Sequence, residues 1–128
     1  MKKLLLPIAL LVCGACRPNV LITVQAGSAA LDDGLKGGER FELSLFLYSQ
    51  ADNGLSNESK TVGLDAQSRF RLNPGTLDLH AISVDSSNPP ESCDPSCDAY
   101  WEGETVNLVV PTKGHIDEVV TVFAVCDC

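Results

Sequence analysis

The 128-residue chain carries 17 Asp and Glu side chains against 9 Lys and Arg, which gives a formal net charge of −8 at pH 7. This acidity excludes nucleic-acid binding, because such binding depends on Lys and Arg that neutralise phosphates. The length corresponds to a single domain that can bury a core of its own.

The N-terminal segment has the order of features that is typical of a secretory signal. Lys2 and Lys3 precede an apolar run over residues 4–12, and two small residues lie directly before Cys16. The apolar run is too short to span a bilayer. We therefore expect residues 1–15 to be a signal peptide.

Cys16 is the residue that we expect to carry a lipid. The segment around it resembles a bacterial lipobox, in which the lipidated cysteine becomes the first mature residue. By resemblance to the usual sorting rule, Arg17 at the next position predicts the outer membrane, facing the periplasm or the cell surface. A plain secretory signal cut near Ala15 is the alternative.

Loss of the signal's two lysines changes the charge from −8 to −10. An anionic membrane would repel so acidic a domain (16–128), so the lipid must anchor it.

The mature chain consists of short runs that alternate apolar and polar residues, separated by turn-forming residues, and no helix is predicted. The predicted strands cover residues 20–25, 41–49, 60–64, 69–72, 76–85, 105–110 and 119–126. Residues 26–40, 50–58 and 86–104 are predicted loops. The alternation slips near Ala81 and Ile82, which suggests a bulge. About seven alternating strands predict an all-β fold, a single antiparallel β-sandwich of immunoglobulin-like type.

Four cysteines remain in the mature domain beyond Cys16: Cys93, Cys97, Cys126 and Cys128. In an exported protein an even set of cysteines indicates disulfides. The last two lie two positions apart on a predicted strand, where a bond between them is unfavourable. Each is therefore expected to reach one of the other two, and the sequence does not choose which. Such bonds close loops of about thirty residues, for roughly 3–4 kcal/mol each. A four-thiolate zinc site is the alternative.

The predicted loop 86–104 holds the candidates for recognition. Tyr100 and Trp101 form a candidate partner-binding patch, because aromatic side chains concentrate binding energy. The alternative is that Trp101 folds back to cover one end of the core. Clustered carboxylates in and around the loop suggest calcium as an alternative to a solvated surface. They are Asp85, Glu91, Asp94, Asp98, Glu102 and Glu104.

Residues with the spacing of a catalytic site are not found. His80 and His115 are too isolated to predict a metal or catalytic role, and no nucleophile elbow, zinc-protease motif or phosphate loop occurs. We therefore expect a protein that is not an enzyme, with no cofactor, no metal and no small-molecule substrate.

Two resemblances to known families agree on the fold. Residues 61–79 (TVGLDAQSRFRLNPGTLDL) resemble transthyretin-like and carboxypeptidase-regulatory-like modules. Residues 20–29, 42–49 and 103–125 resemble the outer-membrane lipoprotein of the type VI secretion membrane complex, itself a small transthyretin-like sandwich. The resemblance implies a lipid-anchored interaction or assembly module of the bacterial envelope, with an envelope protein as partner. An inhibitor of a basic cell-wall enzyme such as a lysozyme is one alternative, and a surface adhesion or carbohydrate-binding module is another.

Overall fold

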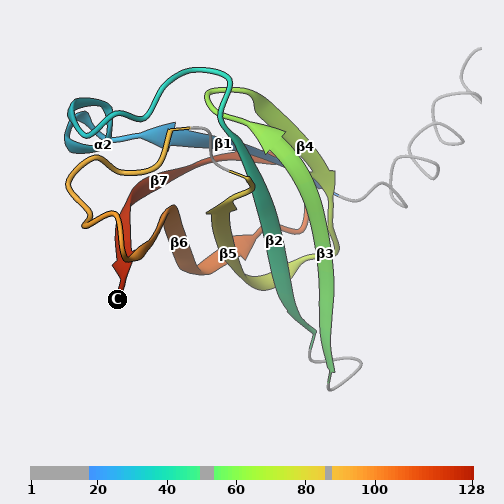
Figure 1. Cartoon of the computed structure of the whole chain (residues 1–128). Coiled ribbons are helices and arrows are strands. Elements are labelled where there is room, and N and C mark those ends of the chain that lie inside the picture. The colour runs from blue at the N-terminus through green and yellow to red at the C-terminus, as the bar shows by residue number, and fades with distance from the viewer. Residues whose placement is uncertain (1–17, 50–53, 86–87) are drawn as a thin grey trace, which may run out of the picture.

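The computed structural model describes residues 18–49, 54–85 and 88–128 (Figure 1). The predicted signal peptide over 1–15 and the predicted lipid-bearing Cys16 lie outside the described residues. Within the part that is described, no helix is long and apolar enough to cross a membrane.

The described residues form seven strands and one short helix, so the prediction of an all-β fold with about seven strands is confirmed. The elements are β1 (Asn19–Ala26), α2 (Ser28–Asp32), β2 (Arg40–Ser49), β3 (Gly54–Gly63), β4 (Gln67–Arg71), β5 (Gly75–Ser83), β6 (Asp98–Val110) and β7 (His115–Asp127). The strands follow one another in the order β3-β2-β5-β6-β7-β1-β4, and the curved sheet folds over itself into a sandwich (Figure 1).

Strand β7 joins the two layers of this sandwich. Its residues 115–122 pair parallel with β1, and its residues 123–127 pair antiparallel with β6. The change of partner brings β7 across β6 at Gly103, where a Cβ atom would overlap the carbonyl oxygen of Thr121. The sheet is therefore mixed, and the expectation of purely antiparallel pairing is wrong at the β1–β7 pair.

The core lies between the layers and follows the predicted alternation. Strands β1, β2 and β5 bury every second side chain over most of their length, as in β1, where Val20, Ile22 and Val24 are at most 1% exposed. Strands β4 and β6 add Phe70 and Trp101, and β2, β5 and β7 contribute most of the other large apolar groups. These are Phe41, Leu43, Leu45, Leu47, Leu77, Leu79, Val120 and Val122.

Three predicted loops contain secondary structure. The first contains α2, a single turn of small residues that buries Ala30. Strand β3 begins at Gly54 because it pairs with β2 along its whole length, although its polar sequence shows no alternation. Strand β6 begins at Asp98, where it pairs with the last residues of β7. In both strands a partner that is distant in sequence overrides the local turn signals.

The bulge lies elsewhere than predicted. Ile82 points outward in a regular alternation, because Ala81 already occupies the inward position. The register shifts instead opposite Asp78, where β6 has an extra residue. Asn107 adopts φ +58° there and donates its backbone N–H to Asp78 Oδ1 at 2.9 Å. An outward carboxylate accepting this N–H stabilises the irregular strand.

Candidate functional site

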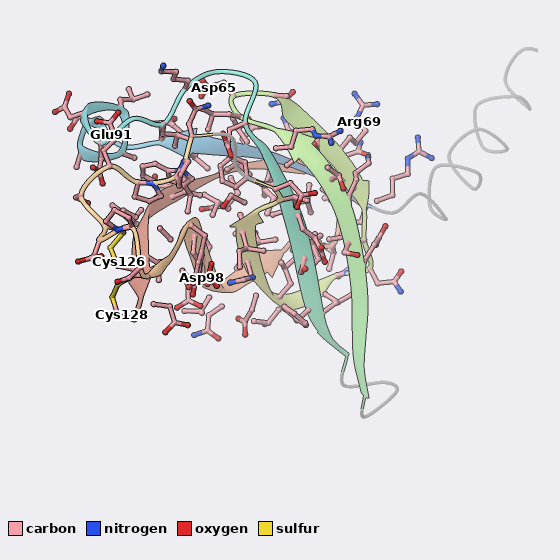
Figure 2. The ribbon with its side chains drawn as sticks, viewed as in Figure 1. Asp65, Arg69, Glu91, Asp98, Cys126 and Cys128 are labelled. Atoms are coloured by element: carbon pink, nitrogen blue, oxygen red, sulfur yellow. A yellow bond between two sulfur atoms is a disulfide. The ribbon has the colours of Figure 1, made fainter. Side chains whose placement is uncertain are left out.

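Two disulfides tie the segment before β6 to the end of β7 (Figure 2). Cys93 bonds to Cys126, and Cys97 bonds to Cys128. The prediction that each C-terminal cysteine reaches one of the two upstream cysteines is confirmed, and the structure selects the pairing. Because all four sulfurs are used in these bonds, the alternative of a four-thiolate zinc site is wrong. Paired disulfides are typical of proteins from oxidising compartments outside the cytoplasm.

Residues 88–97, which we call the disulfide loop, are also held from the opposite side by the turn after α2. Asp33 accepts hydrogen bonds from the backbone N–H of Ser92 at 2.7 Å and from its hydroxyl at 2.6 Å. The backbone N–H of Glu91 donates to the Asp33 carbonyl at 3.0 Å. Gly34 has φ +102°, and a Cβ there would lie 3.0 Å from the Glu91 side chain. A glycine is thus required for the close approach of the loop.

The disulfide loop is further stabilised within itself. Asp94 accepts hydrogen bonds from the backbone N–H of Ser96 at 2.9 Å and from its hydroxyl at 2.8 Å. The backbone hydrogen bond, and then the hydroxyl, lower the pKa of the Asp94 carboxyl below its ordinary value of 3.8. The carboxylate therefore stays ionised at neutral pH and keeps the turn closed.

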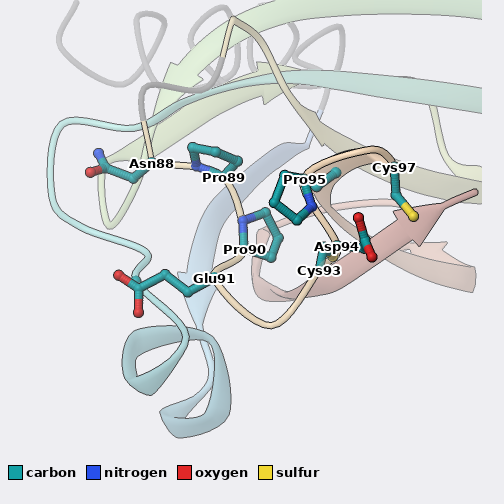
Figure 3. Close-up of a pocket in the computed structure, with 10 residues that line it drawn as sticks. Asn88, Pro89, Pro90, Glu91, Cys93, Asp94, Pro95 and Cys97 are labelled. Atoms are coloured by element: carbon teal, nitrogen blue, oxygen red, sulfur yellow. The ribbon is translucent and has the colours of Figure 1, made fainter.

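The disulfide loop, held by these disulfides and hydrogen bonds, lines an open groove of about 590 Å³ (Figure 3). Pro89, Pro90 and Pro95 line it together with Ala99, and Glu91 and Asp94 supply carboxylates at its edge. Proline rings fix φ, so the apolar lining loses little conformational freedom when a ligand binds. The arrangement is a preformed apolar groove with acidic groups beside it.

A second pocket of about 490 Å³ lies beside the groove, and Ala99 lines both. Tyr100 lines it together with Asp85, Asp98 and Asp127. Loss of solvation, and then the negative charges of Glu102, Asp127 and Asp98, raise the pKa of the Tyr100 hydroxyl. The phenol therefore stays neutral and can donate a hydrogen bond, and the pocket presents negative charge to any ligand. We call this the acidic pocket.

Trp101 does not take part in either pocket. It is 0% exposed within the core, its indole N–H donates to the Asn88 carbonyl at 2.9 Å, and its backbone N–H donates to Ser83 Oγ at 3.0 Å. The prediction that Trp101 contributes to an exposed partner-binding patch is therefore wrong, because strand alternation turns it inward while Tyr100 faces outward. The alternative, that it covers the core, is what the structure shows.

The structure places the remaining candidate residues for a metal or catalytic site apart from one another. Glu102 pairs with His80, with 3.2 Å between Oε2 and Nε2, and His115 is exposed at the start of β7. Among the described residues, no three His, Cys, Asp or Glu side chains are placed to hold a metal ion. The carboxylates considered for calcium are therefore not gathered into one site.

Sequence reasoning missed the role of Asp33 and Gly34. Their contacts with Ser92 and Glu91 join positions nearly sixty residues apart, which no local pattern reveals. The one available signal was the Asp-Gly pair at 33–34, a strong turn dipeptide.

Comparisons with known proteins inform the fold alone. No protein-family model matches the chain, and no curated protein matches it. A solved structure of a DUF4876 family protein from Bacteroides thetaiotaomicron VPI-5482 is similar, with a TM-score of 0.52 and 12% sequence identity. The similarity covers 85% of this chain and 24% of that one, so this chain spans about a quarter of its length. The resemblance to the secretion lipoprotein stays a prediction.

Proposed function

We propose that this protein is a lipid-anchored, non-enzymatic interaction module of the bacterial cell envelope. A lipid on Cys16 holds the sandwich at the outer membrane. The disulfide loop and the acidic pocket bind a basic region of a protein partner in a secretion or other envelope assembly.

The observation that carries this proposal is the covalent stiffening of one end of the domain. The disulfide loop has two disulfides, three hydrogen bonds to Asp33 and three prolines, far more than a solvent-exposed connection requires. A surface that is rigid before binding avoids the loss of loop entropy on binding. Such stiffening around an open groove is typical of a recognition surface.

The chemistry of the partner follows from an unfavourable charge pair. Asp98 and Asp127 lie directly opposite one another on β6 and β7, and like charges in this position destabilise a sheet. Both line the acidic pocket. A lysine or arginine of a partner would relieve their repulsion, so we infer a partner with basic side chains at the contact.

The test is a pull-down from native envelope membranes with the tagged, full-length chain. The unaltered protein should capture a stoichiometric envelope protein, and Asp98→Lys should lose it. Glu58→Lys is the matched control, because it makes the same charge change at an exposed position on β3 that lines neither pocket. Equal capture by all three proteins, or capture of no stoichiometric partner by any, would contradict the proposal.

The acidic pocket also favours a second candidate, an inhibitor of a basic cell-wall hydrolase. An assay of lysozyme-type activity separates the two functions. Inhibition at stoichiometric protein that Asp98→Lys abolishes would support inhibition, whereas unchanged hydrolase rates at a large excess of protein would remove this candidate.

A further inference from the structure

The basic side chains gather at the opposite end of the domain from the disulfide loop. The described residues contain six Lys and Arg residues, and four of them lie around the start of β1: Lys60, Arg69, Arg71 and Lys113. We call this region the basic end. All four side chains are exposed. Figure 2 shows Arg69 on one side of the molecule and Cys126 and Cys128 on the other.

The sheet register fixes this grouping. Arg71 and Arg69 on β4 lie opposite Asn19 and Leu21 on β1. Between them, Phe70 turns into the core. Lys60 Nζ lies 5.1 Å from the centre of the Phe70 ring, which brings β3 into the same group.

Lys113 reaches the same place from the turn between β6 and β7. The next residue, Gly114, accepts a hydrogen bond from the backbone N–H of Asn19 at 3.3 Å. The exposed His115 also pairs with Asn19 in the parallel register. Residues of β4 and of the β6–β7 turn thus flank the first residues of β1, and Lys60 of β3 reaches the same end through the Phe70 ring.

The start of β1, at the basic end, lies close in sequence to Cys16, the residue that we expect to carry the lipid. Cys16 lies three residues before Asn19, and a fully extended chain spans about 10 Å over that length. A lipid on Cys16 therefore keeps the start of β1 within about 10 Å of the lipid headgroups, which is close to the Debye length of about 8 Å at physiological salt.

The acidic groups at the other end of the domain lie too far away to cancel this attraction. β7 runs from the basic end to the disulfides, and its 13 residues extend over about 40 Å. Carboxylates near its far end, such as Asp98 and Asp127, are thus several Debye lengths from the membrane. Asp117 and Glu118 on β7 are nearer, as is Glu58 on β3, two residues before a lysine of the basic end. These three carboxylates offset three of the four positive charges. The charge of the region that faces the membrane therefore differs from the net charge of the whole domain.

We propose that the basic end docks on anionic headgroups of the leaflet that holds the Cys16 lipid. Docking turns the domain so that the disulfide loop and the acidic pocket face away from the membrane. The inference rests on the lipid anchor of the proposed function and adds a defined orientation to it. The ligand is the anionic phosphate surface of the bilayer.

Hydrogen–deuterium exchange of the lipidated, full-length protein on vesicles tests this orientation. One set of vesicles is pure phosphatidylcholine, and the other contains 30% phosphatidylglycerol. Each Lys or Arg near an anionic surface is worth about 1 kcal/mol, so one net charge favours the docked state by about fivefold. Amide exchange over residues 67–72 and 112–115 should slow by this factor on the anionic vesicles only. High salt should return the exchange rate to its value on phosphatidylcholine vesicles.

Charge variants separate docking from other effects. Arg69→Glu with Arg71→Glu should abolish the slowing. The matched control, Lys36→Glu with Arg40→Glu, makes the same charge change away from the basic end and should retain it. Equal exchange on both vesicles, or slowing over residues 88–98 instead, would overturn the docking proposal while leaving the anchor intact. Failure of the wild-type chain to stay with either vesicle would instead contradict the anchor.

Discussion

The two ends of this sandwich connect their strands in different ways. At the basic end, β6 and β7 are joined by the short turn 111–114, and Gly114 at φ +89° lets the chain reverse. At the other end, the disulfide loop has few backbone partners and is held by cystines and by Asp33. A short turn is determined by local conformation, whereas a longer loop without a hydrogen-bonded ladder needs ties from elsewhere. The disulfides and the hydrogen bonds to Asp33 thus occur at the end of the domain whose shape has to be maintained.

Trp101→Ala should have the largest effect, because it removes the largest buried side chain and its hydrogen bond to Asn88. We expect the free energy of unfolding to fall by about 3–5 kcal/mol. Urea unfolding followed by far-ultraviolet circular dichroism measures this. Tyr100→Phe is the control and should change stability by less than about 1 kcal/mol, since it keeps the ring. Similar losses from both variants would show that the strand end is packed differently.

Removing one disulfide should cost about 2–4 kcal/mol, as loop closure predicts. Cys93→Ser with Cys126→Ser, and Cys97→Ser with Cys128→Ser, are the paired variants. Removing the second disulfide from either should cost more than removing the first, because one remaining bond still closes nearly the same loop. Denaturant unfolding checks the energies, and hydrogen exchange checks their location. Loss of protection in turn 111–114 would contradict the independence of the two ends.

Asp98→Lys should stabilise the fold by about 0.2–1 kcal/mol, because it replaces a like-charge pair with Asp127 by an opposite-charge pair. The same substitution is expected to abolish partner capture. A gain in stability with a loss of binding would identify the acidic pair as functional. Thermal unfolding at low salt measures the gain, and a clear destabilisation would show that the two carboxylates do not repel one another.

Asp94 should give the smallest effect, confined to acid pH. Its folded pKa lies below 3.8, so it stabilises the turn above that pH, and the contribution is lost as pH falls through the lower folded value. Amide shifts of Ser96 in an NMR titration should report this transition below pH 3.8. Asp94→Asn keeps an acceptor without the titration and should flatten the curve. A titration midpoint at or above pH 3.8 would contradict the hydrogen bonds from Ser96 to the Asp94 carboxylate.

The sequence predicts the parts of the fold that depend on local alternation. The inward faces of β1 and β2, and the partnership of Cys126 and Cys128 with Cys93 and Cys97, follow from spacing alone. The start of β6, the inward turn of Trp101 and the docking of Ser92 on Asp33 do not. Each depends on a partner that is distant in sequence, and such tertiary contacts override local propensity.

Photo-crosslinking in intact cells tests whether one end of the domain faces the membrane and the other end a protein. A photoreactive amino acid replaces Pro95 in the groove or Gln67 on β4, both exposed positions. We expect a discrete protein adduct from position 95 and none from position 67. The same protein adduct from position 67, with none from position 95, would contradict this orientation.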